Sequence, residues 1–320
     1  MTTLIPQEII DHIISELHSE FKTLYECSLT GWQLLVPARR LIFHSICITQ
    51  DPKEEFGKSG RDHARLLRLV QILENDLSCL PSRQEFPTLS SCVRHLHLRL
   101  ASPFSGRSGC KLSQIISTQA QWNAMNAPLP DVFAQLNHIE NFSIHFLAPG
   151  RCIWRFLEPS ISISFLAFLR SPSIKTLDLS RISGLPAAAV LHCPNLNDLT
   201  MEYMFDEDPE ISADTALTMQ SPGPAMSFEP SCPPPFLESL SVKGSDSFCA
   251  VLANDPAKAV ILHHVRSLIF NYTSPHPFNI QWRISEAAAS TLQVLRLSSN
   301  LDHTPNGAQL LPFKSAAMYF

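Results

Sequence analysis

A six-residue pattern recurs seven times from residue 93 onward and limits the folds that this 320-residue chain can adopt. Each copy has apolar residues at its first, fourth and sixth positions. The copies are Val93–Leu98, Ile139–Ile144, Ile174–Leu179, Leu196–Met201, Leu237–Val242, Val265–Phe270 and Leu292–Leu297. Alternation of this kind predicts a strand with one buried face. Seven such strands indicate a sheet that is built from similar units.

The segments between these copies have helix-like patterns, and several copies follow a turn that contains proline. Successive copies start 22 to 46 residues apart. One strand and one helix in each irregular repeat is typical of a leucine-rich-repeat horseshoe, in which neighbouring repeats bury a shared core. We therefore expect an α/β chain in which residues 92–320 form an irregular leucine-rich-repeat solenoid, with insertions near 101–130 and 205–235. The second insertion changes from acidic to proline-rich, so we predict that it is a disordered surface segment.

The first fifty residues predict a separate unit of three short helices. The first helix would start at Pro6, and the others near residues 23–29 and from Pro37. An apolar stripe with helical spacing runs along the first helix through Ile10, Ile13, Ile14 and Leu17. A unit of this size buries too little apolar surface to be stable alone. The stripe is therefore either core that packs on the rest of the chain or a surface that binds a partner. Residues 51–91 are expected to form a linker and a connecting helix.

Charge and composition exclude several classes of function. The net charge is −5 without any block of like charges, which gives no attraction to nucleic acid or to anionic lipid. No apolar stretch approaches the roughly 20 residues of a membrane-spanning helix, and the N-terminus has no signal-peptide pattern. The nine cysteines are scattered without CxxC spacing, as is typical of reduced, buried thiols. We expect a cytoplasmic or nuclear protein that binds neither nucleic acid nor membrane.

Three N-terminal segments carry a resemblance to a known family. They read LIPQEIIDHIISELH, TLYECSLT and PARRLIFHSI, at residues 4–18, 23–30 and 37–46. This order resembles the F-box-like domain of fungal proteins, in which a Leu/Ile-Pro-x-Glu opening, a Cys-Ser-Leu helix and an Ala-Arg-Arg helix follow one another. The segment FPTLSSCVRHLHLRL at residues 86–100 is similar to the first repeat strand that such proteins carry. The resemblance covers about the first fifty residues, and we assign residues 1–50 to an F-box-like domain.

The resemblance implies a substrate receptor of an SCF-type E3 ubiquitin ligase. Such receptors dock on a Skp adaptor, and through it on a cullin-RING ligase, while their C-terminal domain holds the protein substrate, which the sequence does not identify. Carried over to this chain, the adaptor-binding face would consist of Ile5, Pro6, Ile9, Ile10, Ile13 and Leu17, supported by Leu24, Cys27 and Leu29. The family usually has Trp-Leu-Pro directly before the Ala-Arg-Arg segment, whereas Trp32 comes earlier here. The alternative function is therefore a leucine-rich-repeat interaction scaffold that is not engaged with the ubiquitin system.

The expected repeat strands offer a second surface. Because side chains alternate along a strand, the residues between the buried leucines would face the concave side of a solenoid, which is its usual binding surface. These residues are His95, His97, Arg99, His145, Asp178, Asp198, Thr200, Glu202, Lys243, Asn271 and Arg296. As a group they are expected to contact the substrate. Any single one of them is also explained as an ordinary solvated side chain.

The sequence contains none of the spacings that mark common catalytic motifs. GxSxG, Walker, GxGxxG and HExxH patterns are absent, so we expect no enzymatic activity, no catalytic residue and no cofactor. His95 and His97 would point the same way, but no third ligand follows at a suitable spacing, and we predict no metal site. Cys110 and Cys152 each lie beside a basic residue, which leaves a reactive thiol as the alternative to buried structural thiols.

Overall fold

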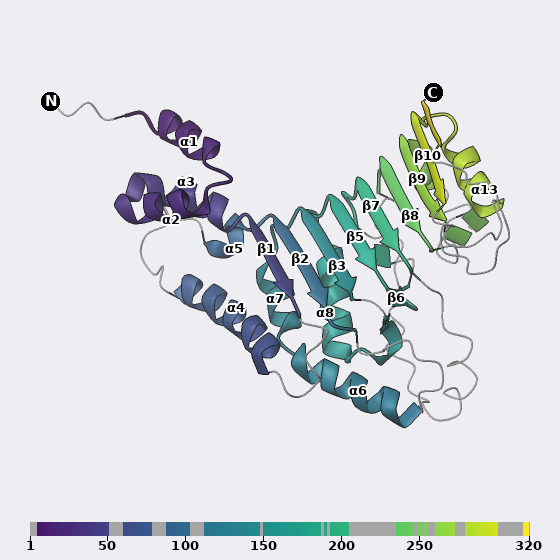
Figure 1. The fold of residues 1–320 in the computed structure, drawn as a ribbon, viewed down its shortest axis with the longest axis horizontal. Coiled ribbons are helices and arrows are strands. Elements are labelled where there is room, and N and C mark those ends of the chain that lie inside the picture. Colours follow the sequence, from purple (N-terminus) through teal and green to yellow (C-terminus); the bar gives the residue numbers. More distant parts are fainter. Residues whose placement is uncertain are drawn as a thin grey trace, which may run out of the picture.

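The computed structural model of the chain is centred on a nine-stranded sheet (Figure 1). It describes residues 5–50, 60–78, 88–102, 112–147, 150–186, 189–190, 193–204, 235–245, 249–250, 253–254, 260–272, 279–299 and 316–319. The strands follow one another in space in the order of the sequence: β1 (Ser45–Thr49), β2 (His95–Leu100), β3 (Asn141–Phe146), β5 (Thr176–Ser180), β7 (Asp198–Glu202), β8 (Ser239–Lys243), β9 (Ser267–Tyr272), β10 (Val294–Ser299) and β11 (Ala316–Tyr319). Neighbouring strands are parallel except for the last pair, β10 and β11.

The helices that follow β1 in the chain pack against one face of this sheet, whereas the three N-terminal helices lie beside its first strand (Figure 1). The helices are α1 (Gln7–Glu16), α2 (Phe21–Thr30), α3 (Trp32–Ile42), α4 (Gly60–Ser78), α5 (Leu89–Cys92), α6 (Leu112–Met125), α7 (Leu129–Gln135), α8 (Pro159–Leu169) and α13 (Asn279–Ala288), with the 3-10 helices η1 (Trp154–Phe156) and η2 (Val260–His264). Two further strands, β4 (Cys152–Ile153) and β6 (Ile182–Ser183), form a separate parallel pair. None of the described helices is both long enough and apolar enough to cross a membrane.

The buried face of the sheet is a set of apolar side chains in matching register. One row crosses six neighbouring strands and consists of Leu96, Phe142, Leu177, Leu199, Leu240 and Leu268, all buried. Helices α7 and α8 cover this row with Phe133, Phe165 and Phe168. The ring of Phe168 lies 5.0 Å from that of Phe133 and 5.0 Å from that of Phe142. The period-two alternation of the sequence thus places every second strand residue in the core and leaves the others on the opposite face.

The expected leucine-rich-repeat horseshoe is wrong. All seven predicted segments do form strands, but these strands belong to the mostly parallel central sheet of an α/β fold. The connections between them differ: α6 and α7 join β2 to β3, whereas β4, η1 and α8 join β3 to β5, and β11 runs antiparallel. A solenoid requires repeated units of similar shape. The strand pattern in the sequence specifies a buried face but not the shape of the connections.

The predicted insertions have different outcomes. Helices α6 and α7 begin within residues 101–130, so that segment contributes to the layer of helices. Of the segment 205–235, which was predicted to be disordered, only Pro235 belongs to the described residues.

The three N-terminal helices have a small core of their own, made by Ile10, Ile14, Leu24 and Ala38. The third helix begins at Trp32, five residues before the predicted start at Pro37, which lies inside the helix. Because proline has no N–H, the Gln33 carbonyl four residues earlier lacks its usual helical donor. The side-chain amide of Gln7 on α1 donates to this carbonyl, with 3.2 Å between nitrogen and oxygen. A tertiary contact therefore supplies the hydrogen bond to the Gln33 carbonyl that the proline cannot make.

Strand β1 joins the three-helix unit directly to the sheet. It follows α3 after only Phe43 and His44, and it pairs with β2 along its full length. Gln50, at the end of β1, is buried with both ends of its side-chain amide satisfied: Nε2 donates to Asn126 Oδ1 and Oε1 accepts from the Ala101 N–H, each at 2.9 Å. Buried amides are stable in this way only when their hydrogen bonds are made. The edge of the sheet is thus fastened to the helix layer.

Candidate protein-interaction surfaces

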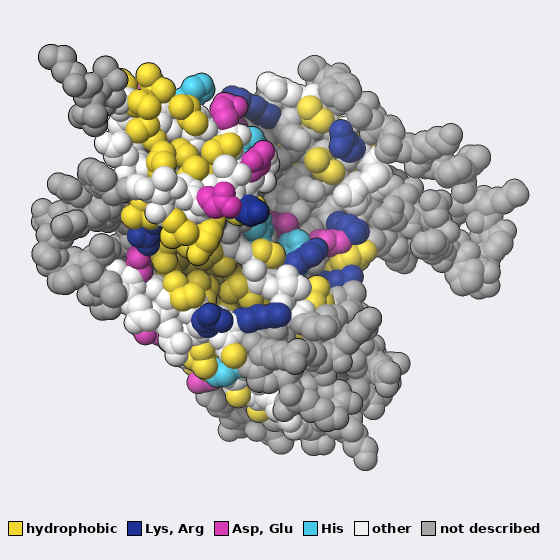
Figure 2. Space-filling view, turned by 60° about the vertical axis from the view of Figure 1, so that its left-hand side comes forward, with side chains coloured by type: hydrophobic (Ala, Val, Ile, Leu, Met, Phe, Trp, Pro, Cys, Tyr) yellow, Lys and Arg dark blue, Asp and Glu magenta, His cyan; other side chains and the backbone are white. Residues whose placement is uncertain are grey.

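The three-helix unit exposes two rows of large apolar side chains. On α1 and just before it lie Ile5, Ile9 and Ile13, which are 50–58% exposed, and on α2 lie Phe21, Tyr25 and Leu29, which are 60–70% exposed. We call these six residues the exposed apolar rows. Figure 2 shows hydrophobic side chains gathered on the side of the molecule that the three-helix unit and α4 form. Six of the twelve large hydrophobic side chains exposed in the described part of the chain belong to these rows, a concentration that is typical of interaction surfaces.

Helix α1 presents one apolar row to its core and one to solvent. Successive residues of an α-helix are about 100° apart, so the neighbouring isoleucines Ile13 and Ile14 point in different directions. Ile14 is 1% exposed and contacts the small core, whereas Ile13 is 54% exposed. Ile9 and Ile10 divide in the same way. The helix is therefore apolar over more of its surface than its own core requires.

The structure corrects one predicted adaptor-binding residue and places the others. Ile10 does not reach the outer surface, because it lies in the core of the unit beside Leu24, which had been predicted only as a support. Ile5, Pro6, Ile9, Ile13 and Leu29 are exposed, and Leu17 and Cys27 are half-buried against the small core. Sequence reasoning missed Phe21 and Tyr25. Their spacing of four residues, continued by Leu29, was the signal for a second row.

A second candidate surface is the face of the sheet opposite the helices. We call it the polar sheet face and define it as the first, third and fifth residues of the eight parallel strands. Parallel pairing in register brings equivalent positions of neighbouring strands side by side, as in the row Cys47, His97, Ser143, Asp178, Thr200 and Ser241. Hydroxyl, amide and charged side chains occupy most of these positions. Parallel sheets usually have helices on both faces, whereas most side chains of this face are half-buried or exposed in the described part of the chain.

All the residues that were expected on a concave face lie on the polar sheet face. They are His95, His97, Arg99, His145, Asp178, Asp198, Thr200, Glu202, Lys243, Asn271 and Arg296. Alternation along the strands was sufficient to group them, although the surface belongs to an open sheet and not to a horseshoe. The structure adds His44, which precedes β1 and therefore gave no strand signal. Its ring lies 4.4 Å from the ring of His95.

Contacts between strands hold many of these side chains in place. The amide nitrogen Nδ2 of Asn141 lies 2.8 Å from His95 Nε2, and Ser143 Oγ lies 2.7 Å from His97 Nδ1. His145 Nε2 lies 2.8 Å from Asp178 Oδ2, an ion-pair distance without hydrogen-bond geometry. Such cross-strand pairs each contribute up to about 1 kcal/mol to a sheet.

Further along the sheet, Lys243 donates to Glu202, and this hydrogen bond raises the pKa of the lysine. Thr176 Oγ1 donates to Asp198 Oδ2 at 3.5 Å. Burial nevertheless raises the pKa of Asp198 above its ordinary value. On β7, Lys243 therefore partly neutralises Glu202, and burial disfavours the charged form of Asp198. On β5, Asp178 lies at ion-pair distance from His145.

Charge is distributed unevenly over the polar sheet face. Its positions on β1, β2 and β3 include three histidines and Arg99 but no carboxylate, whereas β5 and β7 contribute Asp178, Asp198 and Glu202. The pKa of His95 is lowered by burial first, and then by the nearby His44 and His97. The end of the face formed by β1, β2 and β3 thus carries Arg99 and a His95 ring that resists protonation, whereas the middle of the face contains the carboxylates.

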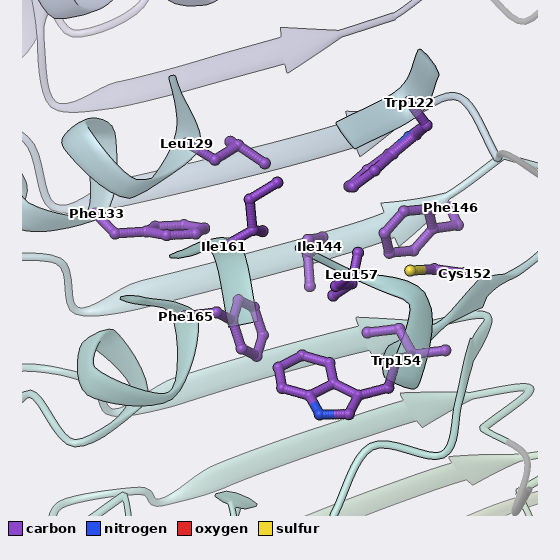
Figure 3. A pocket seen from close by; sticks show the side chains of 11 residues that line it. Trp122, Leu129, Phe133, Ile144, Phe146, Cys152, Trp154, Leu157, Ile161 and Phe165 are labelled. Atoms are coloured by element: carbon purple, nitrogen blue, oxygen red, sulfur yellow. The ribbon is translucent and has the colours of Figure 1, made fainter. Parts of the chain in front are cut away.

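The interior contains a small cavity with apolar walls. Its volume is about 20 Å³, roughly the space of one water molecule. Figure 3 shows its lining side chains pointing toward one another, among them Trp122, Phe146, Trp154 and Cys152.

Burial raises the pKa of the Cys152 thiol well above its ordinary value, which disfavours the nucleophilic thiolate. Cys110, the other cysteine considered as a reactive thiol, lies outside the described residues.

Among the described residues no group of three or more histidine, cysteine, aspartate or glutamate side chains is arranged to hold a metal ion.

Comparisons with known proteins add no assignment: no protein-family model matches the chain, and no curated protein matches it significantly. The two surfaces described above are therefore the features on which a function can be argued.

Proposed function

We propose that the chain is a substrate receptor of an SCF-type ubiquitin ligase. In this proposal the three-helix unit binds a Skp adaptor, and through it a cullin-RING ligase, while the polar sheet face holds the target protein. The exposed apolar rows are the observation that carries the proposal. All of them except Phe21 lie on the segments that resemble the F-box-like domain, and none of the six belongs to the core of the unit.

The exposed apolar rows are suited to a stable interface. Complete burial of a large apolar side chain contributes about 1.5–3 kcal/mol, so six such residues represent a large favourable term even when only part of each is covered. Aromatic residues are enriched at the centres of protein interfaces, and Phe21 and Tyr25 supply two of them. The row on α1 has the spacing by which helices dock along one face on a partner.

In this function the chain performs no bond chemistry. It would bring a target protein close to the ligase and so raise the effective concentration of the reacting groups. The role places the protein in the cytoplasm or the nucleus, where ubiquitin ligases of this class act. The target would be recognised by side chains of the polar sheet face, which stand in register on rigid strands.

Co-purification of the full-length chain with a Skp adaptor tests the proposal. The informative variant is Ile9→Asp/Ile13→Asp, which places two charges on the exposed row of α1 and leaves the buried Ile10 and Ile14 intact. The matched control is Ile72→Asp/Ile163→Asp, because these isoleucines are also exposed but lie on α4 and α8. Circular dichroism confirms that each variant is folded.

The wild-type chain and the control are expected to retain the adaptor, and the row variant is expected to lose it. Failure of the folded wild-type chain to bind, or equal binding by the row variant, would overturn the proposal. The chain would then be an interaction protein that is not engaged with the ubiquitin system.

A further inference from the structure

Three histidine rings lie next to one another where β1 and β2 begin. The ring centroids of His44 and His95 are 4.4 Å apart, and those of His95 and His97 are 6.3 Å apart. His44 is exposed, and the other two are half-exposed on the polar sheet face. Asn141 and Ser143 on β3 contact one nitrogen of His95 and one of His97. This histidine cluster, defined as His44, His95 and His97, is thus held by side chains of two neighbouring strands.

The strands that carry and flank the histidine cluster place Arg99 and no carboxylate on this face of the sheet. Arg99 follows on the same strand, about 7 Å beyond His97, and is exposed. The other side chains that face the cluster from β1 and β3 are Ser45, Cys47, Thr49, Asn141, Ser143 and His145. The nearest acidic group along the chain is Glu140, which precedes β3 and pairs with Lys175 at 2.7 Å and Arg94 at 3.4 Å. Its charge also acts on His95 and raises the pKa of that ring, but this effect is smaller than the lowering by burial and by the two other histidines.

We infer that the histidine cluster and Arg99 form a docking site for an acidic, carboxylate-rich segment of a partner protein. Charge complementarity selects this occupant, because this end of the polar sheet face carries the exposed Arg99 beside three imidazole rings that can donate hydrogen bonds, and β1, β2 and β3 place no carboxylate on it. The acidic residues of β5 and β7 would repel the same segment and so confine it to the first three strands. The inference deepens the proposed function, on which it rests for the role of the partner as a target, by naming the chemistry of the segment that the target presents.

Binding at this site is expected to depend on pH. The pKa of His95 is lowered by burial and by repulsion from the nearby His44 and His97, so this ring is mostly uncharged at neutral pH. A bound carboxylate offsets this repulsion, and binding is therefore accompanied by proton uptake. The side-chain amide of Asn141 can hydrogen-bond to His95 in either protonation state. Its nitrogen donates to the unprotonated ring nitrogen, and its oxygen can accept from the protonated one.

A capped peptide of eight glutamates with a tetramethylrhodamine label, which does not titrate between pH 6 and pH 8, is the probe, and fluorescence anisotropy with the full-length chain is the measurement. Glutamate stays ionised at both pH 6 and pH 8, so any difference between them reports on the protein. Affinity is expected to rise about tenfold from pH 8 to pH 6, as uptake of about half a proton per bound peptide requires. A capped peptide of eight lysines is expected not to bind.

The variant His44→Gln/His97→Gln removes the exposed His44 and the half-exposed His97 and leaves His95, which lies between them, in place. It is expected to weaken binding at pH 6 about tenfold and to reduce the pH dependence to that of the remaining His95. The matched control, His138→Gln/His263→Gln, removes two exposed histidines that lie outside the cluster and is expected to bind like the wild type. Binding that is no tighter at pH 6 than at pH 8, or an equal loss in the control, would overturn the inference.

The adaptor experiment is independent of this test. The Ile9→Asp/Ile13→Asp variant is expected to bind the glutamate peptide normally, and the cluster variant is expected to retain the adaptor. Absence of peptide binding alongside intact adaptor binding would reject the docking site alone. The reverse result would reject the ligase role and retain the docking site.

Discussion

The Arg39 guanidinium on α3 donates a hydrogen bond to the Asp76 carboxylate on α4, with 2.6 Å between Nη2 and Oδ1. The second carboxylate oxygen of Asp76 accepts from the Leu89 N–H at the start of α5, at 2.5 Å. The two charged side chains are only 20% and 12% exposed. One carboxylate therefore connects the three-helix unit to two helices that pack on the sheet.

Replacing Asp76 with alanine is expected to lower the free energy of unfolding by about 2 kcal/mol, because Arg39 and the Leu89 N–H lose their shared acceptor in a half-buried site. Urea unfolding followed by circular dichroism measures this change. Asp76→Asn keeps a carbonyl acceptor and is expected to cost less. Glu74→Ala, at an exposed position on the same helix, is the control. Equal losses in Asp76→Ala and Glu74→Ala would refute the connecting role of Asp76.

Two neighbouring isoleucines on α1 are expected to respond very differently to truncation. Ile14→Ala creates a cavity in the small core and is expected to cost about 3 kcal/mol, whereas Ile13→Ala, at an exposed position, is expected to change stability by less than about 0.5 kcal/mol. Urea unfolding of both variants provides the comparison. Similar losses would show that the two rows of α1 are not divided between core and surface.

Glu140 gives a prediction about acid stability. A hydrogen bond from Lys175 is the main cause that lowers the pKa of Glu140 below its ordinary 4.5, and Arg94 adds to it. A carboxyl group with a lowered pKa in the folded state contributes stability above pH 4.5 and loses it as the pH falls through the folded value. Glu140→Gln is therefore expected to have a lower Tm than the wild type at pH 7, with a difference that shrinks toward pH 3.

Differential scanning fluorimetry between pH 7 and pH 3 makes the measurement. The control is Glu286→Gln, which alters an exposed glutamate on α13. A constant difference in Tm over this range would contradict the assigned role of the Lys175 contact.

Asp198 is expected to behave in the opposite way. Burial is the main cause that raises its pKa above the ordinary 3.8, and Glu238 adds to it, whereas the hydrogen bond from Thr176 lowers it. The folded protein therefore holds this proton more tightly than the unfolded chain does, and ionisation at neutral pH opposes folding. Asp198→Asn retains an acceptor for Thr176 and is expected to raise the Tm at pH 7. The gain should vanish as the pH falls through the folded pKa. A lower Tm at pH 7 would show that the carboxylate stabilises the sheet.

Local patterns predicted the strands and their outward-facing residues, because alternation of apolar and polar residues determines which side chains are buried. The same patterns were silent on the connections, where the horseshoe prediction failed. At the N-terminus, spacing showed that α1 is apolar but not which of Ile10 and Ile13 faces inward, because the partner helices decide this. The start of α3 was missed because the contact from Gln7 to the Gln33 carbonyl, which compensates for Pro37, joins residues 26 apart in the chain.

The short passage from α3 to β1 has a mechanical consequence. Only Phe43 and His44 separate the end of the helix from the edge strand, and Phe43 packs against the core of the sheet. A partner that pulls or turns the N-terminal helices therefore transmits this force directly to the hydrogen bonds between β1 and β2. The orientation of whatever binds those helices is thereby set relative to the strands, without a hinge to absorb the motion.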